Sequence, residues 1–150
     1  MAGLRYGRAL WIFVVAYVVV TVLAVALSVA IGMIGHLPPT PEPMQNQAYL
    51  ISERFLPGMN LLVWAVFAWV YFQRRTATRG EAVALGAFWL AAAVVVDYVG
   101  FVLIRNPLSL SPHDFYVGQF PWIYLIYVAI FLAPICCVAL RWFRPAQAKV

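Results

Sequence analysis

Charged residues are scarce in this sequence. They make up 10% of its 150 residues, whereas hydrophobic residues make up 65%. Soluble domains carry roughly 25% charged residues, because their surfaces have to be hydrated. This shortage excludes an ordinary soluble domain. The formal net charge of +5 does not indicate a nucleic-acid partner, because eight of the ten basic residues flank the ends of long apolar segments, as in membrane proteins.

Cysteine is rarer still. Only Cys136 and Cys137 occur, and they are neighbours near the end of the last apolar segment. Adjacent cysteines rarely pair with each other, because the peptide between them strains the disulfide. The sequence has no C-x-x-C motif and no cysteine in a loop, so it does not fit a thiol–quinone oxidoreductase, which needs an exposed redox pair. The two cysteines are expected to be small packing residues.

Motifs of catalysis and of metal binding are also missing. The sequence has no glycine-rich phosphate loop, no nucleophile elbow, and no H-E-x-x-H or H-x-x-x-H spacing. Its two histidines, His36 and His113, fall in loops at or beyond the membrane surface, which excludes haem ligation by the pair. Paired catalytic groups are lacking as well. We therefore expect no metal and no cofactor, and an enzyme is the least favoured class of function.

What the sequence does contain is four long apolar segments, at about 10–34, 56–72, 82–104 and 120–140. A transmembrane helix needs about 20 predominantly apolar residues, so each segment predicts one span. The first segment is too long for the apolar region of a signal peptide and is expected to be retained. The sequence therefore predicts an all-α membrane protein, with residues 1–150 as a single four-transmembrane-helix bundle. Two outer loops, 35–55 and 105–119, contain most of the prolines.

The basic residues predict the orientation. Only Arg54 and Arg105 fall in the two loops assigned to the outside. The others share the opposite side: Arg5, Arg8, Arg74, Arg75, Arg79, Arg141, Arg144 and Lys149. The positive-inside rule places this second group, and with it both termini, in the cytoplasm. We expect a multi-pass protein of the cell's inner membrane, with the lipid bilayer as its first partner.

Asp97 is the most informative single residue. It lies about eight residues before Arg105, and so about 12 Å below the outer boundary at about 1.5 Å per residue. An ionisable group at such depth costs several kcal/mol unless it is paired or protonated, and it normally faces the interior of a bundle. Gly86, Ala93 and Gly100 recur every seven residues, which is typical of a closely packed helix pair. Asp97 lies one turn from two of them and is expected to point towards that seam.

Other polar residues reach a similar depth on the remaining segments: Ser28, Asn60, Tyr124 and Tyr127. We expect them to surround Asp97 in an outer-half polar cluster. Two tryptophans near the middle of the membrane, Trp64 and Trp89, could wall a pocket for a flat apolar ligand or could simply pack. The cluster itself has two interpretations. It is either a proton- or ligand-binding site, or a protonated carboxyl that joins helices through hydrogen bonds.

A second group of chemically active residues falls in the outer loops. It consists of Arg54, Arg105, Glu53, His113 and Asp114, and we expect these side chains at a solvated outer rim. Exposed ion pairs contribute only about 0–1 kcal/mol, so no large stabilisation is expected from them.

Two classes of function remain. The first is a small membrane protein that binds or transports a small or lipophilic ligand through the polar site at Asp97. The second is a non-catalytic accessory or assembly subunit, acting in a homo-oligomer or a larger membrane complex through helix–helix contacts. The stripe of Ala24, Ser28 and Gly32 on the first segment would be its packing face. A cavity that reaches Asp97 would favour the first class, and a tightly packed Asp97 beside an exposed small-residue stripe would favour the second.

Overall fold

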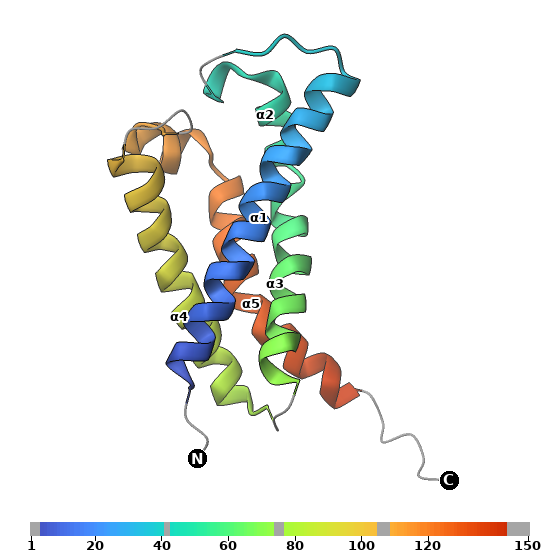
Figure 1. The fold of residues 1–150 in the computed structure, drawn as a ribbon, viewed down its shortest axis with the longest axis vertical. Coiled ribbons are helices and arrows are strands. Elements are labelled where there is room, and N and C mark those ends of the chain that lie inside the picture. The colour runs from blue at the N-terminus through green and yellow to red at the C-terminus, as the bar shows by residue number, and fades with distance from the viewer. Residues whose placement is uncertain (1–3, 41–42, 74–76, 105–108, 144–150) are drawn as a thin grey trace.

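The computed structural model describes residues 4–40, 43–73, 77–104 and 109–143. Within these ranges every regular element is helical (Figure 1). In chain order the elements are α1 (Tyr6–Ile34), η1 (Pro43–Gln45), α2 (Gln47–Glu53), α3 (Leu56–Phe72), α4 (Arg79–Asp97), η2 (Tyr98–Leu103), η3 (Asp114–Gly118) and α5 (Trp122–Phe143).

Three of these helices are long and apolar enough to cross a membrane: α1, α4 together with its continuation η2, and α5. α3 has 17 residues and falls just short by itself. α2 and α3 meet at 54° across a short break, and as a bent pair they could form a fourth span. The predicted helical class is therefore confirmed, and the hydropathy of the helices fits a membrane protein.

Local signals in the sequence explain where the helices begin. The side chain of Asn46 accepts a hydrogen bond from the backbone nitrogen of Tyr49 at 3.2 Å, which starts α2. Thr78 starts α4 in the same way, accepting from the nitrogen of Glu81 at 3.1 Å. Such caps satisfy backbone donors that have no partner inside the helix. Pro57 occupies the first turn of α3, where its missing N–H costs nothing.

The core lies where α3, α4 and α5 pack together. Its largest fully buried side chains include Trp64, Trp89 and Leu85, and the rings of the two tryptophans are 5.2 Å apart. Gly86 lets α4 approach α5 so closely that an added Cβ would clash with the carbonyl oxygen of Phe131. One position of the predicted seven-residue seam thus makes a close helix contact, whereas Gly100 has nothing within 4 Å of its added Cβ.

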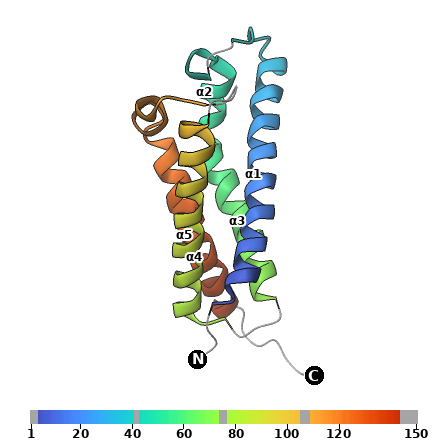
Figure 2. The same ribbon diagram turned by 60° about the vertical axis from the view of Figure 1, so that its left-hand side comes forward.

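α1 is attached mainly through its first half. Its buried residues are Ala9, Ile12, Phe13 and Ala16, and none follows in the second half. Figure 2 shows α1 at one edge of the bundle, α4 and α5 at the other, and α3 between them. α2 folds across one end, which we call the α2 end, while α1 begins and α5 ends at the opposite end (Figure 1). The second half of α1 therefore runs beside the α2 end without filling the space next to it.

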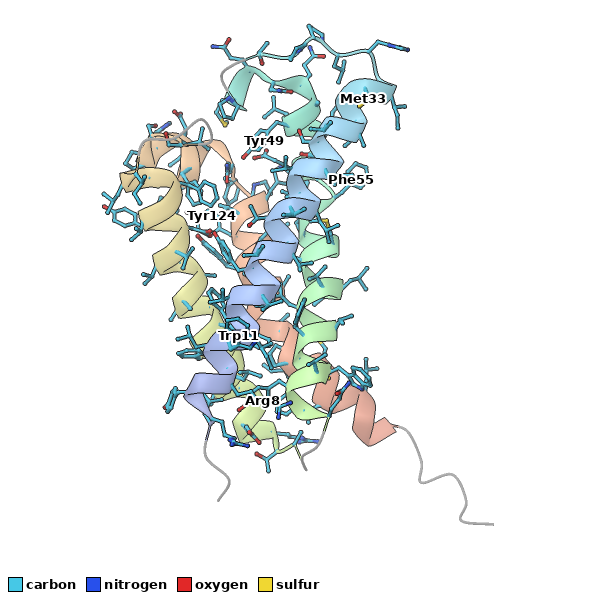
Figure 3. All side chains as sticks on the ribbon, in the orientation of Figure 1. Arg8, Trp11, Met33, Tyr49, Phe55 and Tyr124 are labelled. Atoms are coloured by element: carbon cyan, nitrogen blue, oxygen red, sulfur yellow. The ribbon has the colours of Figure 1, made fainter. Side chains whose placement is uncertain are left out.

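The start of α1 is held by a basic residue. The guanidinium of Arg8 donates to the carbonyl oxygen of Val70 at 2.9 Å and lies 5.7 Å from the ring centre of Tyr71. Val70 is in the last turn of α3, where carbonyl groups lack helical partners and a positive charge is favourable. Arg8 therefore fixes α1 to the end of α3, far from the α2 end (Figure 3).

Candidate ligand-binding site

Two helices that run in the same direction bring Asp97 to its partners. The indole nitrogen of Trp89 donates to the carbonyl oxygen of Ala9 at 3.0 Å. Eight residues further along both α1 and α4, the hydroxyl of Tyr17 donates to Oδ1 of Asp97. Both pairs are separated by 80 positions in the sequence, so α1 and α4 are parallel and in constant register along this stretch.

The carboxyl of Asp97 is held by two tyrosines from different helices. The hydroxyl of Tyr127, on α5, donates to Oδ2 at 2.9 Å, while that of Tyr17 bonds Oδ1. Asp97 is 8% exposed. Each carboxyl oxygen thus accepts one tyrosine hydrogen bond, and neither donor is a basic residue. The polar centre expected at Asp97 is thus a contact between α1, α4 and α5.

The chain changes its helical geometry directly after Asp97. Residues Tyr98–Leu103 form a π-helical turn, and the nitrogen of Ile104 bonds the oxygen of Val99, five residues back, at 3.0 Å. The nitrogen of Leu110 then bonds the oxygen of Phe101 at 2.9 Å. Single π-turns within helices occur often at functional sites. Phe101, in this π-turn, and Leu110, which bonds it, both lie in the wall of a space next to Asp97.

That space is a cavity of about 400 Å³. The second half of α1 forms one side, and α3, α5, Asp97 and the loops at the α2 end form the rest. Most of the lining is apolar, with a few polar side chains set into it. The lining includes Tyr17, Ala24, Ser28, Tyr49, Asn60, Trp64, Asp97, Phe101, Phe115 and Gln119. The combination of apolar walls and few convergent polar groups is typical of small-molecule sites.

A layer of hydrogen bonds lies across the cavity at the α2 end. The amide of Gln119, which is 6% exposed, donates to the hydroxyl of Tyr49. That hydroxyl in turn hydrogen-bonds Glu53. Figure 3 shows Tyr49, a residue of α2, at this end of the molecule. α2 and the segment before α5 are thereby linked at the α2 end of the cavity.

Glu53 corrects the expectation of a solvated outer rim. It is 4% exposed, because α2 folds over the bundle and turns this side chain inwards beneath it. The other rim residues that the structure describes are exposed. Arg54 follows α2, and His113 lies 3.6 Å from Asp114 with side-chain exposures of 77% and 47%. Arg105 lies outside the described residues.

Several predicted site residues do meet in the cavity. Ser28, Asn60 and Trp64 line it together with Asp97. Asn60 does not bond Asp97, however. Its amide donates to the carbonyl oxygen of Leu56 at 2.9 Å, and its oxygen accepts from the indole of Trp64 at 3.1 Å. Trp89 lies behind Trp64, away from the lining, so it supports the wall rather than forming it.

Tyr124 corrects the predicted cluster. Tyr124 is 45% exposed and does not line the cavity. The buried face of α5 is set by Ile123, Tyr127 and Ile130, which recur at spacings of about one helical turn. Tyr124 follows Ile123 by about 100° around the helix axis, so it points out of the bundle.

Sequence reasoning missed Tyr17, the residue closest to Asp97. The available signal was a polar aromatic residue in the middle of an otherwise apolar segment, in VVAYVVVT. A single tyrosine at such a position is compatible with an ordinary apolar span, and the register between α1 and α4 cannot be read from the sequence. Gln119 and Tyr49 were missed for the same reason, since their contact joins residues 70 positions apart.

No family model, curated protein or solved structure matches the chain. In the described part of the chain, no group of three or more histidine, cysteine, aspartate or glutamate side chains could hold a metal ion. The site itself presents a buried, tyrosine-bonded carboxyl at the wall of a mostly apolar cavity.

Proposed function

We propose that this chain is a small integral membrane protein of the inner membrane that binds or transports a small or lipophilic ligand through the cavity at Asp97. One observation carries the proposal: a cavity of about 400 Å³ reaches a buried carboxyl held by two helices. Small-molecule sites have volumes of about 300–1,000 Å³, and an ionisable residue within the membrane is by default a functional candidate.

The proposal includes four membrane crossings with both termini in the cytoplasm. α1 and α4 run in the same direction, as the paired contacts at Trp89 and Asp97 indicate. α3 therefore has to return the chain between them, with α2 lying across its outer end. Its 17 residues are at the short end of the range for a span. The α2 end then faces outwards, consistent with the distribution of basic residues.

The alternative, an accessory subunit, is less well supported. Its expected contact surface was the small-residue stripe of α1. Ala24 and Ser28 of that stripe line the cavity, and a Cβ added to Gly32 would lie 3.4 Å from that of Ala48. The stripe faces the protein's own interior. A homo-oligomer or larger complex would need another surface.

A cavity-filling substitution tests the proposal. Ala24→Phe places a ring in the cavity, whereas Ala26→Phe places it two positions away on an exposed part of the same helix. Native mass spectrometry of each full-length variant, in a steroid-based detergent, would count bound dodecanol, dodecylamine or dodecanoate. We expect the parent and Ala26→Phe to retain at least one of these probes at a single site, and Ala24→Phe to lose it.

The two phenylalanine variants have equal apolar gain, so non-specific partitioning into the detergent shell would affect them alike. Equal retention of every probe by Ala24→Phe and Ala26→Phe would refute a ligand site in this cavity. It would leave Asp97 as an interhelical hydrogen-bonding group.

A further inference from the structure

The ionisable lining of the cavity is acidic only, within the described residues. Among its described lining residues Asp97 is the sole carboxylic acid, and no lysine, arginine or histidine accompanies it. Glu53, the other buried acid at this end, is not part of the lining. A ligand that enters the cavity therefore meets a single acidic group and no fixed positive charge from these residues.

Asp97 also has hydrogen-bonding capacity that its two tyrosines leave unused. An ionised carboxylate can accept about four hydrogen bonds, two at each oxygen. Tyr17 and Tyr127 supply one to each oxygen. The remaining lone pairs are acceptors, so the complementary ligand group is a donor.

Two side-chain amides of the cavity lining, those of Asn60 and Gln119, already make hydrogen bonds within the protein. The amide of Asn60 is bonded on both sides, to Leu56 and to Trp64. The amide of Gln119 is bonded to Tyr49. No buried side-chain nitrogen or oxygen of the described residues lacks a hydrogen-bond partner. Each of these amides keeps a second N–H, and the hydroxyl of Ser28 also lines the cavity, so the preference for a donor ligand comes from the charge and the free lone pairs of Asp97.

Aromatic rings complete the environment of the acid. Tyr17, Trp64, Phe101 and Phe115 all line the same cavity. The faces of aromatic rings attract cations, by about 0.5–2 kcal/mol depending on how far the site is desolvated. An apolar, aromatic-walled space with one acid is suited to a cation that carries a hydrophobic body.

We propose that the ligand of this cavity is a lipophilic amine, whose protonated amino group pairs with Asp97 and whose apolar body fills the space between α1 and α5. This inference rests on the proposed function, because it names the class of ligand for the same site. The ammonium group supplies the hydrogen-bond donors that the free lone pairs of Asp97 accept. Pairing also neutralises a carboxylate that would be costly at this depth.

Probes that differ only in their head groups test the inference. Dodecylamine, dodecanol and dodecanoate carry the same chain with a cationic, a neutral and an anionic head at neutral pH. Binding of each to the purified full-length protein would be measured by native mass spectrometry and by the shift in Tm. We expect the amine to bind the parent about tenfold or more tightly than the alcohol, and the carboxylate to bind weakest.

Asp97→Asn then isolates the charge. It keeps the size and the hydrogen-bonding capacity of the side chain, so dodecanol should bind as in the parent while the preference for the amine disappears. Tyr124→Phe, on the exposed side of α5, serves as the control and should keep the preference. The ranking of the three probes in the parent does not depend on any variant, so the test stands even if Asp97→Asn fails to fold.

The outcomes separate this inference from the function it rests on. If dodecanol or dodecanoate binds the parent as tightly as dodecylamine, or if Asp97→Asn keeps the preference, the ligand is not an amine paired with Asp97. The cavity would still be a ligand site if Ala24→Phe abolished that binding. If no probe distinguishes Ala24→Phe from Ala26→Phe, both proposals fail together.

Discussion

At the scale of single residues, the two tyrosines of α5 are expected to differ in what the loss of the hydroxyl does to stability, although they lie only three positions apart. Tyr127 donates to Oδ2 of Asp97 at 2.9 Å, whereas Tyr124 is 45% exposed. Removing the Tyr127 hydroxyl takes away one of the two donors that hold a buried carboxyl, which typically costs about 1–3 kcal/mol. We therefore expect Tyr127→Phe to lower the thermal stability of the purified protein clearly.

Tyr124→Phe is the matched control, because it removes the same hydroxyl from an exposed position on the same helix. A change within about 0.5 kcal/mol is expected there. Thermal unfolding of both variants, followed by circular dichroism in one detergent, makes the comparison. Similar losses in the two would mean that the bond between Tyr127 and Asp97 does not hold α5 to α4.

The site shows what a sequence can and cannot give at this scale. Depth counting along the apolar segments selected Asp97, Asn60, Tyr124, Tyr127 and Ser28, but depth alone does not say which way a side chain points, and Tyr124 faces out of the bundle. Which polar groups touch depends on the rotation and register of whole helices. Tyr17 was overlooked for that reason. Asn60 lines the cavity as expected but bonds its own helix and Trp64 instead of Asp97.

At the scale of helices, the contact between α4 and α5 depends on the absence of one side chain. A Cβ on Gly86 would meet backbone atoms of Phe131, which cannot move aside as a flexible side chain could. Overpacking of this kind typically costs about 1–3 kcal/mol. We expect Gly86→Ala to lower Tm, even though alanine is the better helix former by about 1 kcal/mol.

Gly58→Ala provides the control for helix propensity alone. Gly58 is an exposed residue of α3, and its added Cβ would have nothing within 4 Å. This variant should be as stable as the parent or slightly more stable. A Gly86→Ala protein that matched it in a thermal unfolding experiment would contradict the close packing of α4 on α5.

Hydropathy located the helices well, because in a long apolar run a helix satisfies the backbone hydrogen-bonding groups internally, and α5 continues as one helix through Pro134. α3 covers the expected range 56–72, and α1 ends at the expected Ile34. The interruption of α4 by a π-turn after Asp97 was not foreseeable. It depends on the contacts of the following loop, such as that between Leu110 and Phe101, rather than on local preference. The inward turn of Glu53 likewise comes from the placement of α2 across the bundle.

At the scale of the whole molecule, the basic residues predict which end is cytoplasmic, and the direction of the helices bears on the number of crossings. Eight of ten basic residues fall on one side of the predicted topology. The parallel course of α1 and α4 requires that both helices start on the same side of the membrane. If the bent pair α2–α3 only dipped into the membrane and returned, α4 would start on the side opposite to α1. The observed register therefore supports a complete crossing by α3.

This topology predicts which residues a membrane-impermeant maleimide can reach. In a background with Cys136 and Cys137 replaced by alanine, His113→Cys lies at the α2 end on a side chain that is 77% exposed. Gly80→Cys lies at the start of α4, exposed and with nothing within 4 Å of its Cβ. With the outer envelope opened and the inner membrane intact, we expect His113→Cys to be labelled. Gly80→Cys should react only after the inner membrane is permeabilised, because the positive-inside rule predicts that this end of the molecule lies in the cytoplasm.

Labelling of both cysteines in intact membranes would contradict the complete crossing by α4. Labelling of Gly80→Cys alone would invert the whole molecule and place the cavity at the cytoplasmic face.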